Sequence, residues 1–350
     1  MHPGGRGDSH RTGPGEGRTV GERGGLSVKL SVAMATCNGA KHLQAQLDSL
    51  LTQTRQPDEL VVTDDRSDDA TPDIVDRFAQ TAPFPVVTRR NPVRLGYIKN
   101  FEQAVELAGG DVILLSDQDD VWHPNKLARH EAAYQARPEV GAVIGDAAVV
   151  GPDLEPLGYS LWQHMGLHPS RVRKFRTGRG LDLYIKRGLC YGVLLSFRAS
   201  YRDVLLPFPL DYSHDDWITI VLSAVSQLEL IAEPLIDYRQ HGGQLIGVGL
   251  FAKPPVGDGS TGQDHYAADL ALARVTTIEE RLRAFPDRWI RPDVLQVIQG
   301  RRAYLERRRS MAGRHPVSRL LVMARNLASG DYLRFGSFPK QDLMADLRGT

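Results

Sequence analysis

The sequence predicts an α/β fold built around a mostly parallel sheet that is covered by helices. Short apolar runs alternate with segments in which apolar residues recur every three or four positions, a pattern typical of strands followed by helices. The run 112–116 is apolar apart from its last residue, as expected for a central strand covered on both faces. Polar and acidic clusters stand where successive strands end, and ligands bind at this edge of open α/β sheets. The sequence therefore predicts a ligand site at the carboxyl ends of the strands.

The first half of the chain alternates four predicted strands with three predicted helices. Pro72 stands at the start of the second helix, where its missing N–H costs no hydrogen bond. Gly109 and Gly110 end the third helix just before the central strand. Such an order needs crossover connections, which make the sheet parallel. The predicted strands are 28–34, 59–63, 85–88 and 111–116, and the helical patterns between them cover 43–51, 71–78 and 98–108.

The second half is predicted to extend this domain and then to add a separate helical part. The interval 158–180 is rich in His and Arg and is expected to be a loop that flanks the site. Further elements of the domain are a helix over 124–137, strands over 140–150, 190–197 and 228–236, and a helix after 215.

The composition changes at about residue 250, and we expect three parts. The stretch 251–263 is rich in Gly and Pro, and helical patterns follow it. The parts are a disordered leader (1–26), an α/β domain (27–250) and a C-terminal linker with a helical extension (251–350), whose helices cover 266–284, 292–312 and 316–327.

Composition narrows the class of protein. The formal net charge is +1 over 350 residues, so no global charge favours nucleic acid as a partner. Two cysteines, Cys37 and Cys190, are too few for a disulfide framework and fit a reducing compartment. The N-terminal segment lacks the apolar core of a secretory signal, and no apolar run approaches the roughly 18–20 residues of a transmembrane helix. We therefore expect a cytoplasmic protein, either soluble or peripheral at the inner face of the plasma membrane.

Three carboxylates, Asp117, Asp119 and Asp120, follow the central strand. Like charges at this spacing repel, so the cluster requires a cation or several hydrogen-bond donors. A hard divalent metal, Mg²⁺ or Mn²⁺, that bridges a diphosphate meets this requirement. A solvated acidic loop is the alternative that these residues alone leave open.

Polar residues also follow the first two strands. Thr36 and Asn38 lie in the first turn, where they can meet a ligand, although Asn38 can equally serve only to turn the chain. Asp64 and Asp65 follow the second strand, and a carboxylate there can accept the N3–H of a uracil or thymine ring. These residues predict the nucleotide-binding edge of the site.

Three further places carry candidate residues. Lys99 and Asn100 begin a helix, where N–H groups and a cation can bind phosphate, or Lys99 is simply solvated. Asp215 and Asp216 begin another helix, and two adjacent acids exceed what helix capping alone requires. His241 lies in a Gly-rich turn, where it can complete a metal shell or remain an ordinary surface residue.

Taken in order along the chain, these motifs resemble those of the family 2 glycosyltransferases. The resemblance covers about residues 28–245, and its third motif most resembles the rhamnosyltransferase-like members that build bacterial surface polysaccharides. It implies the GT-A fold and an inverting transfer from a nucleotide-activated sugar. The motifs are Val-Ala-Met-Ala-Thr-Cys-Asn-Gly (32–39), Val-Val-Thr-Asp-Asp-Arg-Ser-Asp-Asp-Ala-Thr (61–71), Leu-Ser-Asp-Gln-Asp-Asp-Val-Trp (115–122), His-Asp-Asp-Trp (214–217) and Tyr-Arg-Gln-His-Gly (238–242).

The resemblance assigns roles at the nucleotide end of the site. Thr36 and Asp64 correspond to nucleoside contacts, with Asp65 beside them. Asp117 corresponds to the ribose-binding first acid of a DxD motif and Asp119 to its metal ligand.

The same resemblance assigns roles at the reacting end. Asp216 corresponds to the catalytic base, and Asp215 stands where the family usually has Glu. His241 matches the position of a C-terminal metal ligand. Cys37 replaces the aromatic residue that often stacks on the base, so the identity of the nucleotide stays open.

These observations lead us to expect an inverting glycosyltransferase that uses Mg²⁺ or Mn²⁺. Its donor is a UDP- or dTDP-sugar, with dTDP-rhamnose among the candidates, and its acceptor a hydroxyl of a surface polysaccharide or lipid-linked glycan. A sugar nucleotidyltransferase is one alternative, but the turn 36–39 is not the Gly-rich basic loop that grips a triphosphate. A catalytically inactive sugar-nucleotide-binding module is the other, and the retained Asp215–Asp216 pair argues against it.

A lipid-linked acceptor would bring the enzyme to a membrane surface. The predicted helix 292–312 combines apolar residues with five arginines that can attract an anionic leaflet. The alternative is that the arginines face solvent or pair with Glu279, Glu280 and Glu306. The arginines are Arg301, Arg302, Arg307, Arg308 and Arg309.

Overall fold

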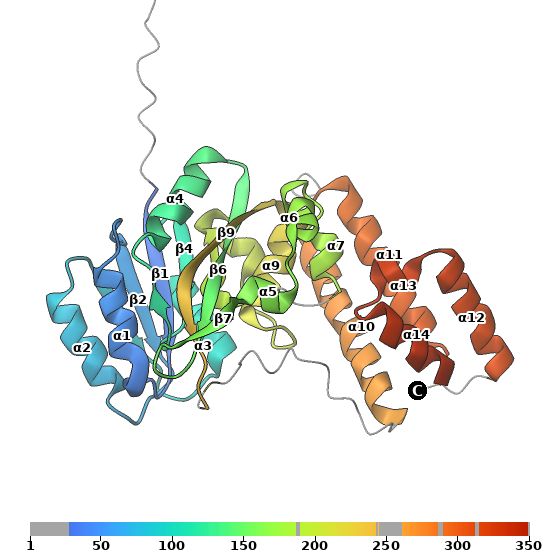
Figure 1. The fold of residues 1–350 in the computed structure, drawn as a ribbon, viewed down its shortest axis with the longest axis horizontal. Coiled ribbons are helices and arrows are strands. Elements are labelled where there is room, and N and C mark those ends of the chain that lie inside the picture. The colour runs from blue at the N-terminus through green and yellow to red at the C-terminus, as the bar shows by residue number, and fades with distance from the viewer. Residues whose placement is uncertain are drawn as a thin grey trace, which may run out of the picture.

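The computed structural model describes residues 28–186, 190–242, 244, 261–285, 290–311 and 315–348. A helix-covered sheet forms one part of the described chain, and a group of C-terminal helices packs beside it (Figure 1). The predicted leader, 1–26, lies outside the described residues, as does the predicted linker up to residue 260. Residues 261–263, also expected in the linker, already belong to a helix.

A nine-stranded sheet forms the core of the larger part, in the order β3-β2-β1-β4-β8-β6-β9-β5, with β7 paired to β6. β1, β2, β3 and β4 run parallel to their neighbours among these four, as the alternating pattern predicted. The strands are β1 (Leu30–Thr36), β2 (Glu59–Asp64), β3 (Val86–Arg90), β4 (Val112–Ser116), β5 (Val121–Trp122), β6 (Val140–Val150), β7 (Pro156–Ser160), β8 (Leu195–Arg198) and β9 (Gln227–Arg239).

The second half of the sheet is mixed. β8 runs antiparallel to both β4 and β6, and β5 runs antiparallel to β9, whereas β6 and β9 are parallel. The predicted α/β class is confirmed, but the unbroken parallel order covers only β3, β2, β1 and β4. The parallel order ends after β4, because beyond this strand consecutive strands are no longer each separated by a single helix.

The helices between the first strands present apolar faces to the sheet. Leu43, Leu47 and Leu50 of α1 are fully buried, in agreement with the predicted helical spacing. These helices are α1 (Ala40–Leu51), α2 (Thr71–Thr81), α3 (Tyr97–Leu107) and α4 (Lys126–Ala136).

The interval 158–180 was expected to be a loop, and this prediction is wrong. It contains the end of β7 and two helices, α5 (Leu161–Met165) and α6 (Pro169–Arg176). Ser160 and Gln163 form a reciprocal capping box that starts α5. Pro169 occupies the first turn of α6, where it is tolerated. Further along lie α7 (Leu181–Tyr184), α8 (Arg202–Leu205) and α9 (His214–Val225).

The C-terminal extension is helical, as predicted, and contains two more helices than the sequence pattern indicated. Val275 and Ile278 from its first helix, and Val294 and Ile298 from its second, join the core. The helices are α10 (Thr261–Arg283), α11 (Pro292–Arg309), α12 (Pro316–Ala328), α13 (Asp331–Phe335) and α14 (Pro339–Arg348). Nowhere in the described ranges is a helix long and apolar enough to cross a bilayer.

The five arginines of α11 do not form a free basic face, so the membrane contact predicted for them loses its basis. They form contacts within the helical extension. The alternative prediction was that these arginines pair with acidic residues of the chain, and this is correct for Glu279 and Glu306. Arg302 pairs with Glu279 and Glu306, Arg307 with Asp331, Arg308 with Asp342 and Asp346, and Arg309 with Asp269, while Arg301 is 3% exposed and donates to the carbonyl oxygen of Phe335.

The pairing predicts unequal effects for two neighbouring arginines. Arg308→Met should lower the free energy of unfolding by about 3 kcal/mol, because it leaves the enclosed carboxylates of Asp342 and Asp346 without their cation. Arg309→Met is the matched control and should cost less than about 1 kcal/mol, because its pair with Asp269 is solvent-exposed. Urea unfolding followed by circular dichroism measures both. Equal losses for the two variants would contradict the structure.

Candidate functional site

A cavity of about 870 Å³ opens at the carboxyl ends of β1, β2 and β4. The parallel register causes this, since Thr36 lies opposite Asp64 and Met34 opposite Ser116, so the following turns meet at one edge. Among the predicted site residues, the cavity is lined by Thr36, Asn38, Asp65, Asn100, Asp117, Asp119, Asp215 and His241, and not by Asp64, Lys99 or Asp216.

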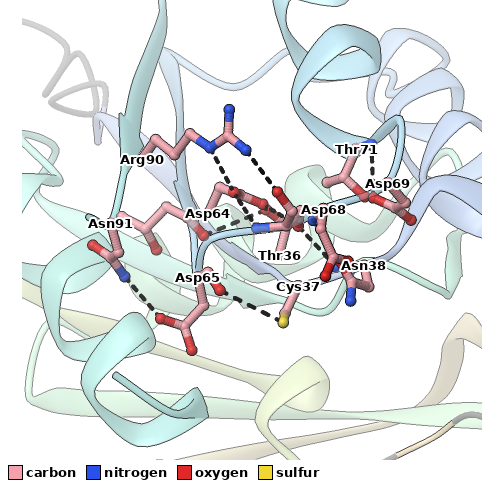
Figure 2. A network of polar contacts seen from close by, with 12 residues as sticks. Thr36, Cys37, Asn38, Asp64, Asp65, Asp68, Asp69, Thr71, Arg90 and Asn91 are labelled. Carbon is pink, nitrogen blue, oxygen red and sulfur yellow. Dashed lines mark hydrogen bonds and ion pairs between the residues drawn. The ribbon is translucent and has the colours of Figure 1, made fainter. Parts of the chain in front are cut away.

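Asp64, at the end of β2, holds two turns together. Its carboxylate accepts from the hydroxyl of Thr36 at 3.0 Å and from the backbone N–H of Ser67 at 2.9 Å (Figure 2). The guanidinium of Arg90 lies 3.7 Å from the same carboxylate. Asp64 is 6% exposed, and these contacts occupy both of its oxygens. Its predicted nucleoside contact is untested, and the structure gives it an internal role.

The neighbouring Asp65 faces the cavity while fixing the turn that follows β3. Its two carboxylate oxygens accept from the backbone N–H groups of Leu95 at 2.7 Å and Gly96 at 2.9 Å. The side-chain amide of Asn91 donates to it at 3.1 Å. Asp65 therefore shapes the wall of the cavity beside Cys37, whose thiol points toward its carbonyl oxygen.

The predicted phosphate contacts at the start of α3 have other partners. The ammonium group of Lys99 pairs with Glu102 at 2.7 Å and donates to the carbonyl oxygen of Phe208. Asn100 is 2% exposed and donates to the carbonyl oxygens of Thr63 and Thr36. Asn100 thus joins β1 to β2 beneath the cavity, and Lys99 lies away from its lining.

Gln118, which the sequence analysis did not single out, clamps the first turn to the acidic stretch. Its side-chain oxygen accepts from the N–H of Cys37 at 2.9 Å, and its amide donates to the carbonyl oxygen of Cys37 at 3.0 Å. A Cβ at Gly39 would lie 2.1 Å from the same amide oxygen, so a side chain here would displace the Gln118 amide from its two hydrogen bonds with Cys37. The position of Gln118 between two predicted acidic ligands is the signal that could have identified it.

The acidic cluster forms as the sequence predicted. One carboxylate oxygen from each of Asp117, Asp119 and Asp120 lies within 4.8 Å of the others. Burial and the neighbouring carboxylate of Asp119 raise the pKa of Asp117 to about 8. Asp120 is fully buried; its Oδ1 accepts from the N–H of Arg239, and its Oδ2 has no hydrogen-bond partner among the described residues.

A buried lysine lies behind this cluster. Lys126 is 0% exposed, donates to the carbonyl oxygen of Val193 at 2.6 Å and lies 3.7 Å from the centre of the Trp122 ring. Burial lowers its pKa to about 7, opposed by the charges of Asp120 and Asp117. This cation sits beneath the acidic cluster and offsets part of its repulsion.

His241 meets the cluster from the end of β9. Its Nε2 lies 2.9 Å from Oδ2 of Asp119, and its ring lies 4.5 Å from that of His42, measured between centroids. The three close carboxylates match the oxygen ligands that Mg²⁺ and Mn²⁺ prefer, and the imidazole of His241 stands beside them. The unpartnered, buried Oδ2 of Asp120 indicates that the cluster is short of cations, so these residues fit the predicted divalent metal.

Asp215 and Asp216 begin α9, which borders the cavity, and they point to different surroundings. Asp215 lines the cavity, is close enough to raise the pKa of Asp117, and accepts from the N–H of Asp216 at 2.8 Å. Asp216 faces α10, where the guanidinium of Arg274 lies 3.8 Å from its carboxylate. Burial and the charge of Asp215 raise the pKa of Asp216 to about 7.

Arg274 is a site residue that sequence reasoning missed. Its Nε donates to the carbonyl oxygen of Asp211 at 2.8 Å, and its guanidinium lies 4.3 Å from the centre of the Tyr212 ring. These contacts fix the C-terminal extension against the segment that leads into α9. No local signal marks Arg274, because α10 shows an ordinary helical pattern.

His214 completes this wall of the cavity. Its ring stacks on Phe101 with a centroid distance of 4.0 Å, and it is 6% exposed. Both ring nitrogens lack hydrogen-bond partners among the described residues, and burial lowers the pKa of the imidazole. A neutral imidazole with a free donor and a free acceptor therefore faces the ligand space.

Residues 31–204 match the sequence model of the family described as Glycosyl transferase family 2. The chain is 31% identical over 236 residues to the uncharacterized glycosyltransferase alr2836 of Nostoc sp. strain PCC 7120, a match that covers 61% of this chain and 66% of that protein. It is 33% identical over 98 residues to the dTDP-rhamnosyl transferase RfbG of Shigella flexneri, covering 27% of this chain and 34% of that protein. The matches thus span just under two thirds and about a third of these two curated relatives.

The fold is similar to that of S. aureus TarS residues 1–349, solved in complex with UDP-GlcNAc. The TM-score is 0.53 at 16% identity, and the alignment covers 91% of this chain and 89% of that chain. At this identity the likeness concerns the fold, and it agrees with the predicted GT-A architecture.

The geometry of the acidic cluster predicts that Asp119 contributes more to metal binding than Asp120 does. Asp119→Asn should weaken Mn²⁺ binding about 100-fold or more, because it removes the carboxylate that faces both the cavity and His241. Isothermal titration calorimetry of the purified chain with Mn²⁺ measures the affinity. Asp120→Asn is the comparison variant and should weaken Mn²⁺ binding much less, because Asp120 lies behind the lining and asparagine still accepts from the N–H of Arg239. Wild-type affinity in Asp119→Asn would contradict the assignment.

Proposed function

We propose that the protein, whose residues 31–204 match the sequence model of Glycosyl transferase family 2, transfers a sugar from a nucleoside diphosphate to a hydroxyl group of a glycan. The observation that carries this proposal is one cavity of about 870 Å³ whose lining brings Asp117 and Asp119 of the acidic cluster together with His241 and Asp215. A nucleotide sugar placed there has its diphosphate beside Asp119 and its sugar beside the α9 carboxylates. The reaction class is inverting transfer by a single displacement.

The nucleoside would lie against the turns after β1 and β2. Thr36 and Asn38 line this end, and Asp65 with its bound 91–96 turn forms the side wall. Cys37 gives the base a small, polarizable neighbour in place of an aromatic ring. We propose a UDP- or dTDP-sugar as donor, with a deoxysugar such as rhamnose favoured by the resemblance of the 115–122 motif and by the RfbG match.

The diphosphate end would be held by Asp117, Asp119 and His241 together with a divalent cation. Such a cation, when bound, acts as a Lewis acid that stabilises charge on the departing diphosphate. Lys126 and the N–H of Arg239 keep the acidic cluster in place from behind. The protein residues thereby fix where the leaving group sits before the reaction begins.

The reacting hydroxyl needs a base on the face opposite the leaving group. As its oxygen attacks the anomeric carbon, the bond from that carbon to the diphosphate oxygen breaks, and the hydroxyl proton passes to a carboxylate. We assign this role to Asp216 on the resemblance of the 214–217 motif, and its raised pKa of about 7 suits a base near neutrality, whereas in this structure its carboxylate faces Arg274 and only Asp215 of the pair lines the cavity. Asp215, whose carboxylate accepts from the N–H of Asp216, would contact the donor sugar.

The base assignment predicts distinct behaviour for two variants. Asp216→Asn should lower turnover by on the order of 10²–10⁴, because asparagine cannot take the acceptor proton. Release of nucleoside diphosphate from UDP- and dTDP-sugars with Mn²⁺ measures it, and the donor affinity should be unchanged. Asp215→Asn, the matched control, should mainly raise the KM for the donor.

Other outcomes of this assay would redirect the proposal. Inactivity of Asp215→Asn with activity in Asp216→Asn would move the base to Asp215. Formation of nucleoside triphosphate from the nucleotide sugar and pyrophosphate would indicate a sugar nucleotidyltransferase. Tight donor binding with no turnover of any sugar would indicate an inactive binding module.

Arg274 predicts a change in the pH profile of the reaction. Its positive charge lowers the pKa of Asp216, and a base works only when deprotonated, so the rate rises as pH passes through this pKa. Arg274→Gln should therefore shift the acidic limb of kcat/KM to higher pH, and Arg274→Lys should restore it in part. Arg281→Gln is the matched control on the same helix, since Arg281 donates to backbone carbonyls of 204 and 206. A lower rate in Arg274→Gln with an unshifted limb would reduce Arg274 to a purely structural role.

A further inference from the structure

The helix α12 has its apolar side turned outward. Along its solvent-facing side, Val317 is 60% exposed, Leu320 54%, Leu321 71% and Leu327 54%. Ala324 lies on the same side and is also exposed. A surface helix of a globular protein normally presents this kind of stripe to the core. The exposed stripe therefore marks an interaction surface.

The inner side of α12 confirms that the helix is not simply rotated or loosely packed. Met323 is 4% exposed and Asn326 is fully buried. The side-chain oxygen of Asn326 accepts from Nε of Arg307 at 2.8 Å, which ties α12 to α11. A polar contact thus fixes the inward side, while the leucines remain in solvent.

The charges around the stripe are positive. α12 contains Arg319 and Arg325 and no acidic residue. Arg325 is exposed beside Leu321 on the helix, and Arg334 and Lys340 are exposed on the adjoining elements. None of these three exposed cations has an ion pair within the described part of the chain. The described acids of this region all pair with arginines inside the extension, Asp331 with Arg307, and Asp342 and Asp346 with Arg308.

We propose that α12 is a docking site for an anionic lipid bilayer, with its leucine stripe in the boundary between headgroups and acyl chains. A helix of 13 residues is about 20 Å long, enough to lie in that plane but too short to cross it. The stripe supplies apolar area, and Arg325, Arg334 and Lys340 supply attraction to anionic headgroups. The contact uses α12 and its neighbours, and leaves the paired arginines of α11 inside the fold.

The charge pattern favours a bilayer over a second copy of the chain. In a symmetric pair the same patch meets itself, so the cations around each stripe would face each other. An anionic leaflet instead complements them at every position. The docking does not depend on the proposed sugar transfer, so it can be tested without any substrate.

Sedimentation of the full chain with lipid vesicles tests the proposal. The wild type should pellet with vesicles of equal parts phosphatidylcholine and phosphatidylglycerol, and much less with phosphatidylcholine alone. The double variant Leu320→Glu, Leu321→Glu should bind the anionic vesicles at least about tenfold more weakly, because it replaces two leucines of the docking stripe with negative charges that the anionic surface repels. Both positions face solvent, so the variant should keep the wild-type circular dichroism spectrum.

A matched control distinguishes binding through α12 from nonspecific hydrophobic binding to the vesicles. Leu210 is 72% exposed, as exposed as Leu321 at 71%, and it lies outside the helical extension, so Leu210→Glu should pellet like the wild type. Absence of wild-type pelleting, or pelleting unaffected by the double variant, would overturn the proposal. So would a lipid-free wild-type dimer that the double variant converts to a monomer without any vesicle binding, since that result assigns the stripe to a second copy.

Discussion

The repulsion among carboxylates gathered at one edge of the sheet is the constraint on which the rest of the structure depends. β1, β2 and β4 are parallel and end together, so the side chains that follow them share one small volume. Burial makes the charged forms of Asp117 and Asp120 costly, and the pKa of each is raised. Lys126 and the backbone N–H of Arg239 lie behind the cluster and offset part of this cost. The negative charge that these groups do not offset faces the cavity, where a divalent cation and a diphosphate would bind.

Much of this arrangement could be predicted because its causes are local. An apolar run followed by an acidic residue predicts both a strand and the edge of the sheet at which the acidic side chain lies. The cavity accordingly contains Thr36, Asp65, Asp117 and Asp119 as the sequence indicated. The sequence could not say which of two adjacent acids faces the ligand. Asp64 turned inward because Thr36, Ser67 and Arg90 surround it, and those partners come together only when β1, β2 and β3 pair.

The remaining differences arise from contacts between distant segments. A count of arginines along α11 indicates a basic face, but the acids that neutralise it come from other helices, two of which the pattern did not indicate. Arg274 reaches Asp216 because α10 packs on the segment before α9, a placement that helical periodicity does not encode. The helices within 158–180 are a different case. Ser160 and Gln163 did carry a capping signal, and the polar composition of the interval obscured it.

The clamp between Gln118 and the first turn also restricts how this chain can diverge. Because the glutamine amide occupies the space where a side chain at Gly39 would stand, neither position can change alone without loss. A larger residue at 39 would displace the Gln118 side chain, and a shorter residue at 118 would remove its hydrogen bonds to the backbone of Cys37. Substitutions in the turn 36–39 are thereby linked to substitutions in the acidic segment 117–120. Homologues that altered one half would be expected to carry a compensating change in the other, so the pair offers a marker of lineage within the family.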